Sequence, residues 1–266
     1  MLSREDAEAA AADLLRAERE RCQIGLISRR FPGMTLDDAY AIQSAQMTRK
    51  LAEGRRIVGW KIGLTSRAMQ EALGIETPDS GVLYDDMLFG NGATVPRGRF
   101  IQPRIEAEIA FVLCRGISGN ATREEVLAAT EFVTPALEIL DTRITRVDAD
   151  TGAPRVIFDT ISDNAANAGL VLGDGRFDPA EVDLRWIGSI VKKNGRVEAT
   201  GLGAAVLDDP ATSIVWLARR MAGYGQELQA GQIVLSGSFI PPIECPPGSR
   251  IRADFGRFGA VSLDFA

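Results

Sequence analysis

Two acidic residues on one face of an apolar strand constrain this chain more than any other feature. Residues 104–113 read RIEAEIAFVL, with apolar side chains alternating along the second half and a proline before the first residue. This pattern is typical of a β-strand. Because successive side chains of a strand point to opposite faces, Glu106 and Glu108 project from the same face. Two such carboxylates repel each other and lose hydration, so the arrangement is costly unless a cation lies between them.

A third acidic residue, Glu138, lies in an equally apolar segment, residues 132–140 (FVTPALEIL). Three oxygen ligands without nitrogen or sulfur suit a hard cation such as Mg²⁺, Mn²⁺ or Ca²⁺. A Glu-x-Glu pair is also common on the solvated face of an antiparallel sheet. The residues alone therefore leave two interpretations open, a metal site and a solvated face.

The chain has no histidine among its 266 residues. That absence excludes a Ser-His-Asp triad, a Cys-His pair and histidine-based zinc sites. Any acid–base chemistry must use carboxylates, lysine, tyrosine, cysteine or metal-bound water.

Charge and composition restrict the kinds of partner and the cellular compartment that we expect. The formal net charge of −6, with no basic block, argues against nucleic acid as a partner. No apolar run is long enough to span a membrane, and residues 1–6 (MLSRED) lead into a charged helical pattern instead of a signal peptide. Cys22, Cys114 and Cys245 form no CxxC pair, so we expect free thiols in a reducing compartment and a cytoplasmic protein.

Capping signals predict the helices. Ser3 can begin a helix through about Arg21, and Thr35 with Asp38 resembles a capping box for a helix that ends before Gly54. Similar signals predict shorter or later helices, which are Ser66 to Gly74, Thr122 to about Thr130 and Asp209 to Met221. The last of these should cover a sheet with its apolar residues.

The rest of the chain has the pattern of β-structure. Residues 57–64 are strand-like, 82–111 contain short strands separated by Gly and Pro, and Asn194-Gly195 marks a hairpin turn. Strands are also expected near residues 170–172, 232–235, 250–255 and 261–265, and 142–155 should be an exposed polar loop. We therefore predict one α+β domain over residues 1–266, with a helical segment (1–55) and a mixed, largely antiparallel β-core (56–266). A nucleotide-binding fold is not expected, since no GxGxxG or P-loop is present.

Two polar residues stand out near the start of this core. Lys61 is embedded among apolar residues, where it can extend to the surface, bind an anion, or have a lowered pKa. Asp79 follows Pro78 in a turn-like stretch, where it serves either the turn or catalysis.

Two further segments are candidates for contact with a ligand. Residues 158–169 are small and polar, so they form either an ordinary loop or a segment in which Ser162 or Asn164 orients a ligand. The loop around Gly237 and Ser238 follows an apolar strand and could present backbone N–H groups to an anion.

Six segments taken together resemble one family, in the order GWKIGLTSRAMQ (59–70), PDSGVLYDDM (78–87), PRIEAEIAFVL (103–113), PALEILD (135–141), FDTISDNAANAG (158–169) and VLSGSF (234–239). They resemble the 2-keto-4-pentenoate hydratase family of the fumarylacetoacetate hydrolase superfamily. Within it, they are most similar to hydratases of 2-oxohept-3-enedioate, also written 2-oxo-hept-4-ene-1,7-dioate, in homoprotocatechuate degradation. The resemblance extends over almost the whole chain.

The resemblance implies a β-roll core of the fumarylacetoacetase C-terminal type and a divalent metal, usually Mg²⁺ with Mn²⁺ as the alternative. The implied metal ligands are Glu106, Glu108 and Glu138. It implies catalytic roles for Lys61 and Asp79, whereas Trp60 replaces a histidine found in similar sequences. It also implies a homo-oligomer and, for some members, a homologous decarboxylase as partner.

The implied activity is the addition of water to a 2-hydroxydienoate dicarboxylate, giving a 4-hydroxy-2-oxo acid. Ser162, Gly237 and Ser238 are then expected to contact the substrate. Arg143, Arg146 and Arg155 are unranked candidates for binding the distal carboxylate. The alternatives are a 4-oxalocrotonate-type decarboxylase and a catalytically silent partner subunit.

Overall fold

The amino-terminal helices begin at the predicted caps. The computed structural model describes residues 2–67, 70–71, 75 and 77–266. Helix α1 (Arg4–Glu20) starts after Ser3, whose hydroxyl accepts a hydrogen bond from the amide of Asp6 at 3.1 Å. Thr35 and Asp38 form a capping box at the start of α3 (Leu36–Ala52), and the short α2 (Ile27–Arg30) lies between. Both predicted helices are confirmed.

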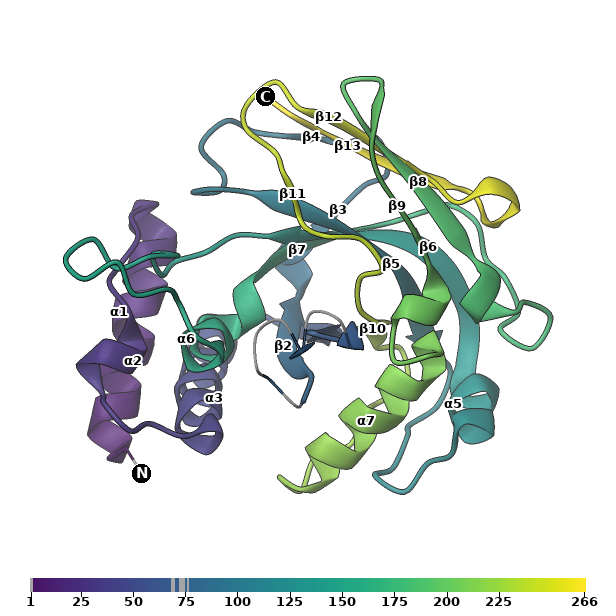
Figure 1. The fold of residues 1–266 in the computed structure, drawn as a ribbon. Coiled ribbons are helices and arrows are strands. Elements are labelled where there is room, and N and C mark those ends of the chain that lie inside the picture. The colour runs from purple at the N-terminus through teal and green to yellow at the C-terminus, as the bar shows by residue number, and fades with distance from the viewer. Residues whose placement is uncertain (1, 68–69, 72–74, 76) are drawn as a thin grey trace.

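These helices share an apolar core with a segment far along the chain. Leu14, Ile27 and Ile42 are buried there together with Ile144 and with Ile161 of α6 (Ile157–Ser162). Figure 1 shows α1, α2, α3 and α6 grouped at one side of the sheets. The prediction of an exposed loop at residues 142–155 is therefore wrong at its start, since the side chain of Ile144 packs in this core.

The larger sheet has eight strands. Along its main path the order is β2-β1-β10-β5-β6-β7-β3, and β11 pairs with β5. All pairings are antiparallel except β1 with β10 and β3 with β7. The strands are β1 (Ile57–Gly63), β2 (Asp79–Tyr84), β3 (Leu88–Phe89), β5 (Arg104–Leu113), β6 (Thr130–Leu140), β7 (Asn167–Leu172), β10 (Ile233–Leu235) and β11 (Ile243–Glu244).

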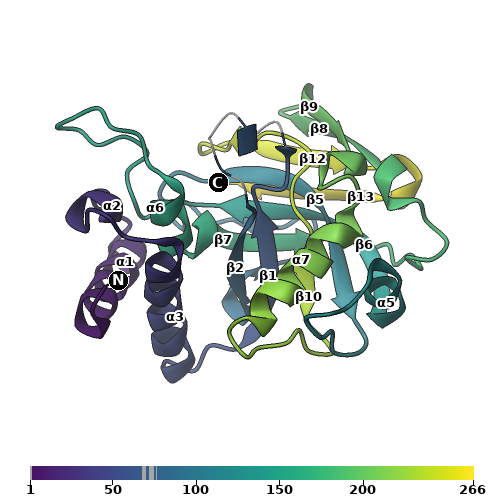
Figure 2. The same ribbon diagram turned by 60° about the horizontal axis from the view of Figure 1, so that its bottom comes forward.

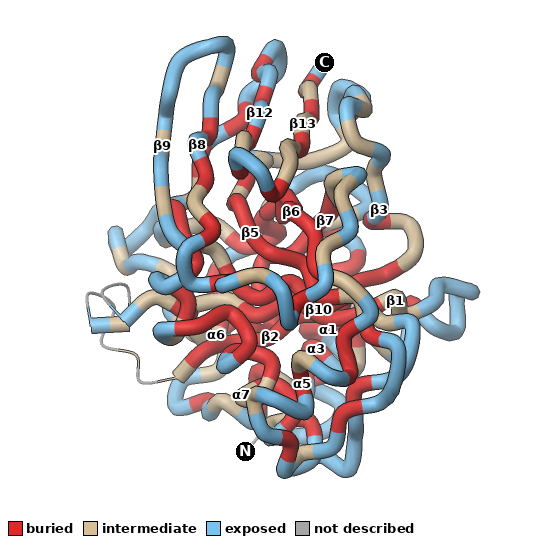
Figure 3. The backbone as a smooth tube through the Cα atoms, turned by 90° about the vertical axis from the view of Figure 1, so that its right-hand side faces the viewer, coloured by how far each residue is buried: buried red, intermediate tan, exposed pale blue. Residues whose placement is uncertain are grey.

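The smaller sheet has five strands, in the order β4-β13-β12-β8-β9. Asn194 and Gly195, with φ of 52° and 81°, form the predicted turn between β8 and β9. This sheet lies at the top of Figure 1, and Figure 3 shows that β9 is largely exposed while the centre of the larger sheet is buried. Its strands are β4 (Thr94–Val95), β8 (Gly188–Lys193), β9 (Arg196–Leu202), β12 (Arg250–Asp254) and β13 (Ala260–Phe265).

Two further helices, α5 and α7, pack against the larger sheet. Asp209 caps α7 (Pro210–Ala222), and Ile214 and Leu217 of this helix are fully buried in the main core. Figure 2 shows α7 passing in front of β1 and β10. Helix α5 (Arg123–Ala129) begins at the predicted Thr122 capping box. None of the described helices combines the length and the apolar character needed to cross a bilayer.

The polar run at residues 158–169 folds differently from an ordinary loop. It forms most of α6, then the 3-10 turn η2 (Asn164–Ala166), then the start of β7. All three residues of η2 have positive φ, between 50° and 58°. The side chain of Asn164 holds this turn, because its amide exchanges two hydrogen bonds with the backbone of Val82, at 2.8 and 3.0 Å.

Two other predictions concern the segment before β2. Asp79 was expected in a turn, but it is the first residue of β2. The predicted helix from Ser66 to Gly74 lies in part outside the described residues.

Candidate active site

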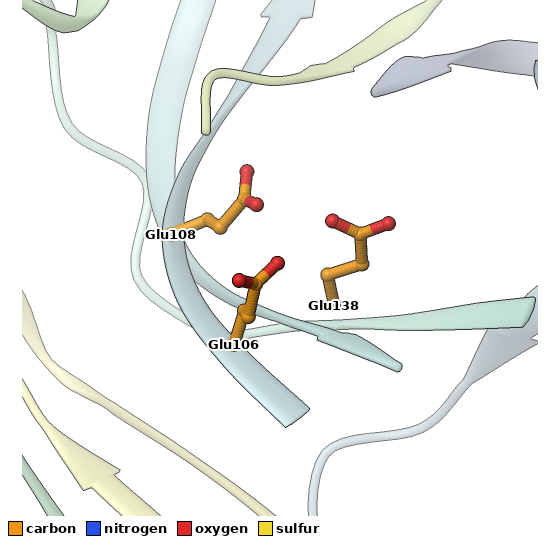
Figure 4. A group of neighbouring side chains, drawn as sticks. All are labelled: Glu106, Glu108 and Glu138. Carbon is orange, nitrogen blue, oxygen red and sulfur yellow. The ribbon is translucent and has the colours of Figure 1, made fainter. Parts of the chain in front are cut away.

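Strand register brings the three glutamates together. In the antiparallel pair β5–β6, Glu106 lies directly opposite Glu138, and Glu108 lies opposite Ala136. All three carboxylates therefore occupy one face, and Figure 4 shows them converging on a common space. Each offers an oxygen within 4.8 Å of the others. Like charges directly opposite each other destabilise a sheet, so the arrangement requires compensation.

Burial excludes the solvated-face interpretation. The residues Glu108 and Glu138 are both 0% exposed. Burial, and then the carboxylate of Glu138, raises the pKa of Glu106 to about 8. The same two causes raise the pKa of Glu108 well above its ordinary value. Without a cation, the cluster resists carrying three full negative charges at neutral pH.

In two of the carboxylates, one oxygen accepts a hydrogen bond and the other is open, which here means buried without a described hydrogen-bond partner. Glu138 Oε1 accepts a hydrogen bond from Asn167 Nδ2 at 2.7 Å and lies 3.3 Å from Lys61 Nζ. Glu108 Oε2 accepts one from the amide of Gly237 at 2.7 Å. The other oxygens, Glu108 Oε1 and Glu138 Oε2, are buried without a hydrogen-bond partner among the described residues.

Such an arrangement fits a divalent cation. Leaving a buried carboxylate oxygen without a partner is costly, so native proteins rarely do so without a reason. Metal-ligating carboxylates are commonly oriented by hydrogen bonds to the atoms that do not face the metal. The described residues offer three oxygen donors and no nitrogen or sulfur in the cluster, which suits a hard cation.

Lys61 and Asp79 lie on one face of the sheet because of the strand register, and each has a glycine opposite it on the paired strand. In the antiparallel pair β1–β2, Lys61 faces Gly81 and Asp79 faces Gly63. A Cβ at Gly63 would lie 2.3 Å from Asp79 Oδ1 and 2.9 Å from Lys61 Nζ, which is closer than atoms can approach. Glycine at position 63 therefore leaves the space that the side chains of Lys61 and Asp79 occupy.

The surroundings of Lys61 determine its charge state. Its side chain is 3% exposed, so it does not extend to the surface. Burial by itself would lower the pKa of Lys61, but the carboxylates of Glu138 and Asp79 raise it above the ordinary value. With the carboxylates free of metal, the shift is thus opposite to the lowered pKa considered from the sequence, and it favours the ammonium form of Lys61.

The pKa of Asp79 is shifted upward, unlike that of a carboxylate stabilised in its charged form at the surface. Burial raises its pKa above the ordinary value, although the ammonium of Lys61 opposes this shift. Its Oδ1 atom is buried and has no hydrogen-bond partner among the described residues. A buried carboxyl group whose pKa is raised in this way is a candidate for proton transfer to or from a bound molecule.

The predicted substrate contacts are engaged to different degrees. The Ser162 hydroxyl is buried without a described partner and remains available. The amide of Gly237 is occupied by Glu108, and Ser238 Oγ donates to the carbonyl of Ile240 at 2.8 Å. In the 236–239 loop, the amide of Gly237 therefore orients the Glu108 side chain and is not free to bind an anionic ligand.

Each guanidinium nitrogen of Arg143 donates a hydrogen bond inside the protein. Its Nε donates to Asp163 Oδ1 at 2.5 Å, and its other guanidinium nitrogens donate to the carbonyls of Asp163 and Asn167. Among the three arginines considered for the distal carboxylate, Arg143 is thus committed to other groups.

Two supporting residues were missed at the level of sequence. Asn167 orients Glu138, and Gln43 of α3 donates to the carbonyls of Ser80 and Ile161, at 2.8 and 3.1 Å. Asn167 lies within the polar run already noted, but nothing local distinguishes it from its neighbours. Gln43 had no local signal, because its partners are far away in the chain.

A comparison with protein-family models agrees with this fold. The family model described as the fumarylacetoacetate (FAA) hydrolase C-terminal family matches residues 62–265, and the chain belongs to this family. The match confirms the predicted family and the α+β fold.

Individual relatives narrow the comparison. The chain is 48% identical to a 2-oxo-hept-4-ene-1,7-dioate hydratase of Escherichia coli, over 96% of each chain. It is 42% identical to a 2-keto-4-pentenoate hydratase of Paraburkholderia xenovorans strain LB400, over 97% of this chain and 94% of the relative. Among solved structures, a 4-oxalocrotonate decarboxylase from Pseudomonas putida G7, complexed with magnesium and adipate, has a TM-score of 0.94 at 34% identity. That alignment covers 100% of this chain and 99% of the decarboxylase.

Proposed function

We propose that this protein is a divalent-metal-dependent hydratase that adds water to a seven-carbon 2-oxo-enoate dicarboxylate, or its 2-hydroxydienoate tautomer. The product is a 4-hydroxy-2-oxo acid. The observation that carries the proposal is the pair of buried oxygens on Glu108 and Glu138 that lack a described hydrogen-bond partner, together with the buried Lys61 beside Glu138. The 48% identity to a hydratase of 2-oxo-hept-4-ene-1,7-dioate supports the choice of substrate.

The proposed metal ligands are Glu106, Glu108 and Glu138, and the proposed ion is Mg²⁺, with Mn²⁺ as the alternative. A divalent cation, when bound, supplies positive charge against the 1-carboxylate and 2-oxygen of the substrate, where negative charge develops. Asn167 and Gly237 keep the ligands oriented by holding one oxygen each of Glu138 and Glu108.

Lys61 and Asp79 divide the remaining work. The Lys61 ammonium, held by Glu138, stabilises negative charge on the substrate's carboxylate or 2-oxygen. Asp79 moves protons: first for the tautomerisation that gives a conjugated enone, then for the water that adds at C4. The substrate gains one water and loses no atoms. We propose substrate contact for Ser162, whose hydroxyl lacks a described partner. Gly237 and Ser238 act indirectly, through Glu108 and the loop itself.

A 4-oxalocrotonate-type decarboxylase is the second candidate, favoured by the TM-score of 0.94 to such an enzyme. The fold alone does not separate the two reactions, because both would use a divalent metal held by the same three glutamates. The identity of 48% to a hydratase against 35% to a 4-oxalocrotonate decarboxylase from Pseudomonas sp. strain CF600 favours hydration. A silent partner subunit would have no need for buried carboxylates with open oxygens.

Assembly and location are further parts of the proposal. We propose a homo-oligomer, with a homologous decarboxylase as a partner, and sedimentation velocity on the purified protein tests the first point. We also propose a cytoplasmic location, supported by three cysteines that are all free.

An absorbance assay with freshly generated 2-hydroxydienoates, with Mg²⁺ and with chelator, tests the activity. A product heavier by one water from the seven-carbon diacid, lost on chelation, is the expected result. Loss of CO₂ would move the assignment to the decarboxylase. Absence of turnover with every dienoate and metal would favour the silent subunit.

A further inference from the structure

Three arginines that the proposed reaction does not use lie near one another, where β5 begins two residues before Glu106. We call Arg104, Arg146 and Arg155 the arginine cluster. Arg104 lies on β5 two residues before Glu106, so its side chain leaves the strand on the same face as Glu106 and Glu108. Alternate residues on a strand are about 6.6 Å apart, which is of the order of the length of a short dicarboxylic acid.

The other two arginines reach this place through the loop after β6. The amide of Arg155 donates to the carbonyl of Arg146 at 2.8 Å, which holds the two residues side by side. Arg146 Nη1 donates to Glu244 Oε1 at 2.5 Å, and Glu244 of β11 is the register partner of Arg104. Glu244 thus connects Arg146 to the strand that carries Arg104.

The cluster has more positive charge than the described residues neutralise. Glu244 forms an ion pair with Arg146, whereas no described acid lies within ion-pairing distance of Arg104 or Arg155. The Nε atoms of Arg104 and Arg146 are buried without a described hydrogen-bond partner. Arg155 donates to the hydroxyl of Thr142 at 2.6 Å. Buried guanidinium donors without an acceptor are costly, so the arrangement calls for an anion.

We propose that Arg104 and Arg155 bind the distal carboxylate of the substrate, with Arg146 positioned beside them by Glu244. The inference rests on the proposed function, in which the 1-carboxylate lies at the glutamates on the same face of the sheet. It makes the cluster the element that selects dicarboxylates over monocarboxylates. An acid without the distal group would leave the guanidinium donors unpaired, which is a strong basis for discrimination.

A binding experiment tests this without turnover. The probes are 2-oxoheptanedioate and 2-oxoheptanoate, saturated 2-oxo acids that differ in the distal carboxylate. Calorimetry on the Mg²⁺-loaded protein should show the diacid binding about 10- to 100-fold more tightly, the value of a charge-assisted hydrogen bond. Arg104→Gln and Arg155→Gln should each reduce that preference, and Arg104→Lys should restore part of it because the charge remains.

Arg196→Gln, on the exposed strand β9, is the matched control and should keep the full preference. Equal affinity of the unaltered protein for both acids would overturn the inference. So would an equal loss of affinity for both acids in Arg104→Gln and Arg155→Gln, since that result indicates a structural role.

Turnover separates this inference from the proposed function. With the seven-carbon dienoate diacid, Arg104→Gln should raise KM by about 10- to 100-fold, while kcat/KM for the five-carbon monoacid changes by less than about 3-fold. If the unaltered protein prefers the diacid in calorimetry but turns over neither dienoate, the proposed reaction is wrong and the distal site stands. If it turns over both dienoates with equal kcat/KM, the reaction stands and the distal site is wrong.

Discussion

The buried ion pair of Arg143 with Asp163 and the buried glutamate cluster differ in whether their polar atoms all have hydrogen-bond partners. Arg143 and Asp163 form a closed pair, in which the guanidinium donates to the carboxylate and to two carbonyls, and the second carboxylate oxygen accepts from the Arg143 amide at 2.8 Å. The glutamate cluster is open, because Glu108 and Glu138 each keep one buried oxygen without a described partner.

This difference in hydrogen bonding distinguishes a buried pair with a structural role from a buried cluster that binds a ligand. A closed buried pair needs nothing further, and breaking it leaves an uncompensated charge in the interior. An open cluster is stable only when something else completes it, and strongly shifted carboxyl groups in such a cluster are typical of functional sites. The same burial therefore has opposite meanings, and substitutions in the two groups should have opposite effects.

Glu108→Gln should have the largest effect, and on activity. The amide oxygen can still accept from Gly237, but the open oxygen becomes an NH₂ group that cannot bind a cation. We expect kcat/KM to fall by at least about 1000-fold, since a Lewis acid contributes several kcal/mol and each 1.36 kcal/mol is tenfold. In chelator, thermal unfolding should occur at an equal or higher temperature, because the substitution removes one of the buried acids whose ionisation is unfavourable in this cluster. Retained activity would contradict the metal site.

Asp163→Asn should have its effect on stability instead. It leaves the Arg143 guanidinium buried without its counter-ion, and we expect a loss of about 3–5 kcal/mol in the free energy of unfolding. Urea denaturation measures this loss, and the Mg²⁺ affinity of the folded protein should stay close to that of the unaltered chain. Asp208→Asn, which breaks an exposed pair with Arg67, is the control and should cost less than about 1 kcal/mol.

Asn167→Ala should have an intermediate effect. It removes the hydrogen bond that orients Glu138, and such supporting contacts contribute about 10- to 100-fold in metal affinity. Titration with Mg²⁺, followed by activity or calorimetry, measures the change. An unchanged affinity would mean that the salt bridge with Lys61 orients Glu138 by itself.

The smallest effect concerns pH in the metal-free protein. Burial and Glu138 raise the pKa of Glu106 to about 8 from the ordinary 4.5. Between these values the folded state keeps a proton that the unfolded state has lost, so this contribution to stability is present at low pH and lost as pH rises through about 8. In chelator, the unfolding temperature should therefore fall as pH rises across this range. Saturating Mg²⁺ should reduce the fall, because metal binding requires the deprotonated carboxylate. A rising unfolding temperature in chelator would contradict the shift.

Local features of this protein follow from the sequence by itself. The caps at Ser3, Thr35 and Thr122 and the Asn194-Gly195 turn depend on neighbours within a few residues, and all of them formed. The absence of histidine restricted the chemistry, and the order of six motifs identified the family and a hydratase relationship that the comparisons confirm. That the chain is one domain, and which residues are catalytic, stay predictions.

Only the tertiary structure decided which groups complete one another. The register that sets Glu106 opposite Glu138, and the commitment of Arg143 to Asp163, join residues from different elements. The burial of Ile144 and the turn held by Asn164 likewise depend on partners far away in the chain. A sequence pattern reports the conformation of a segment. Whether a buried charge is closed or open depends on every element that packs around it.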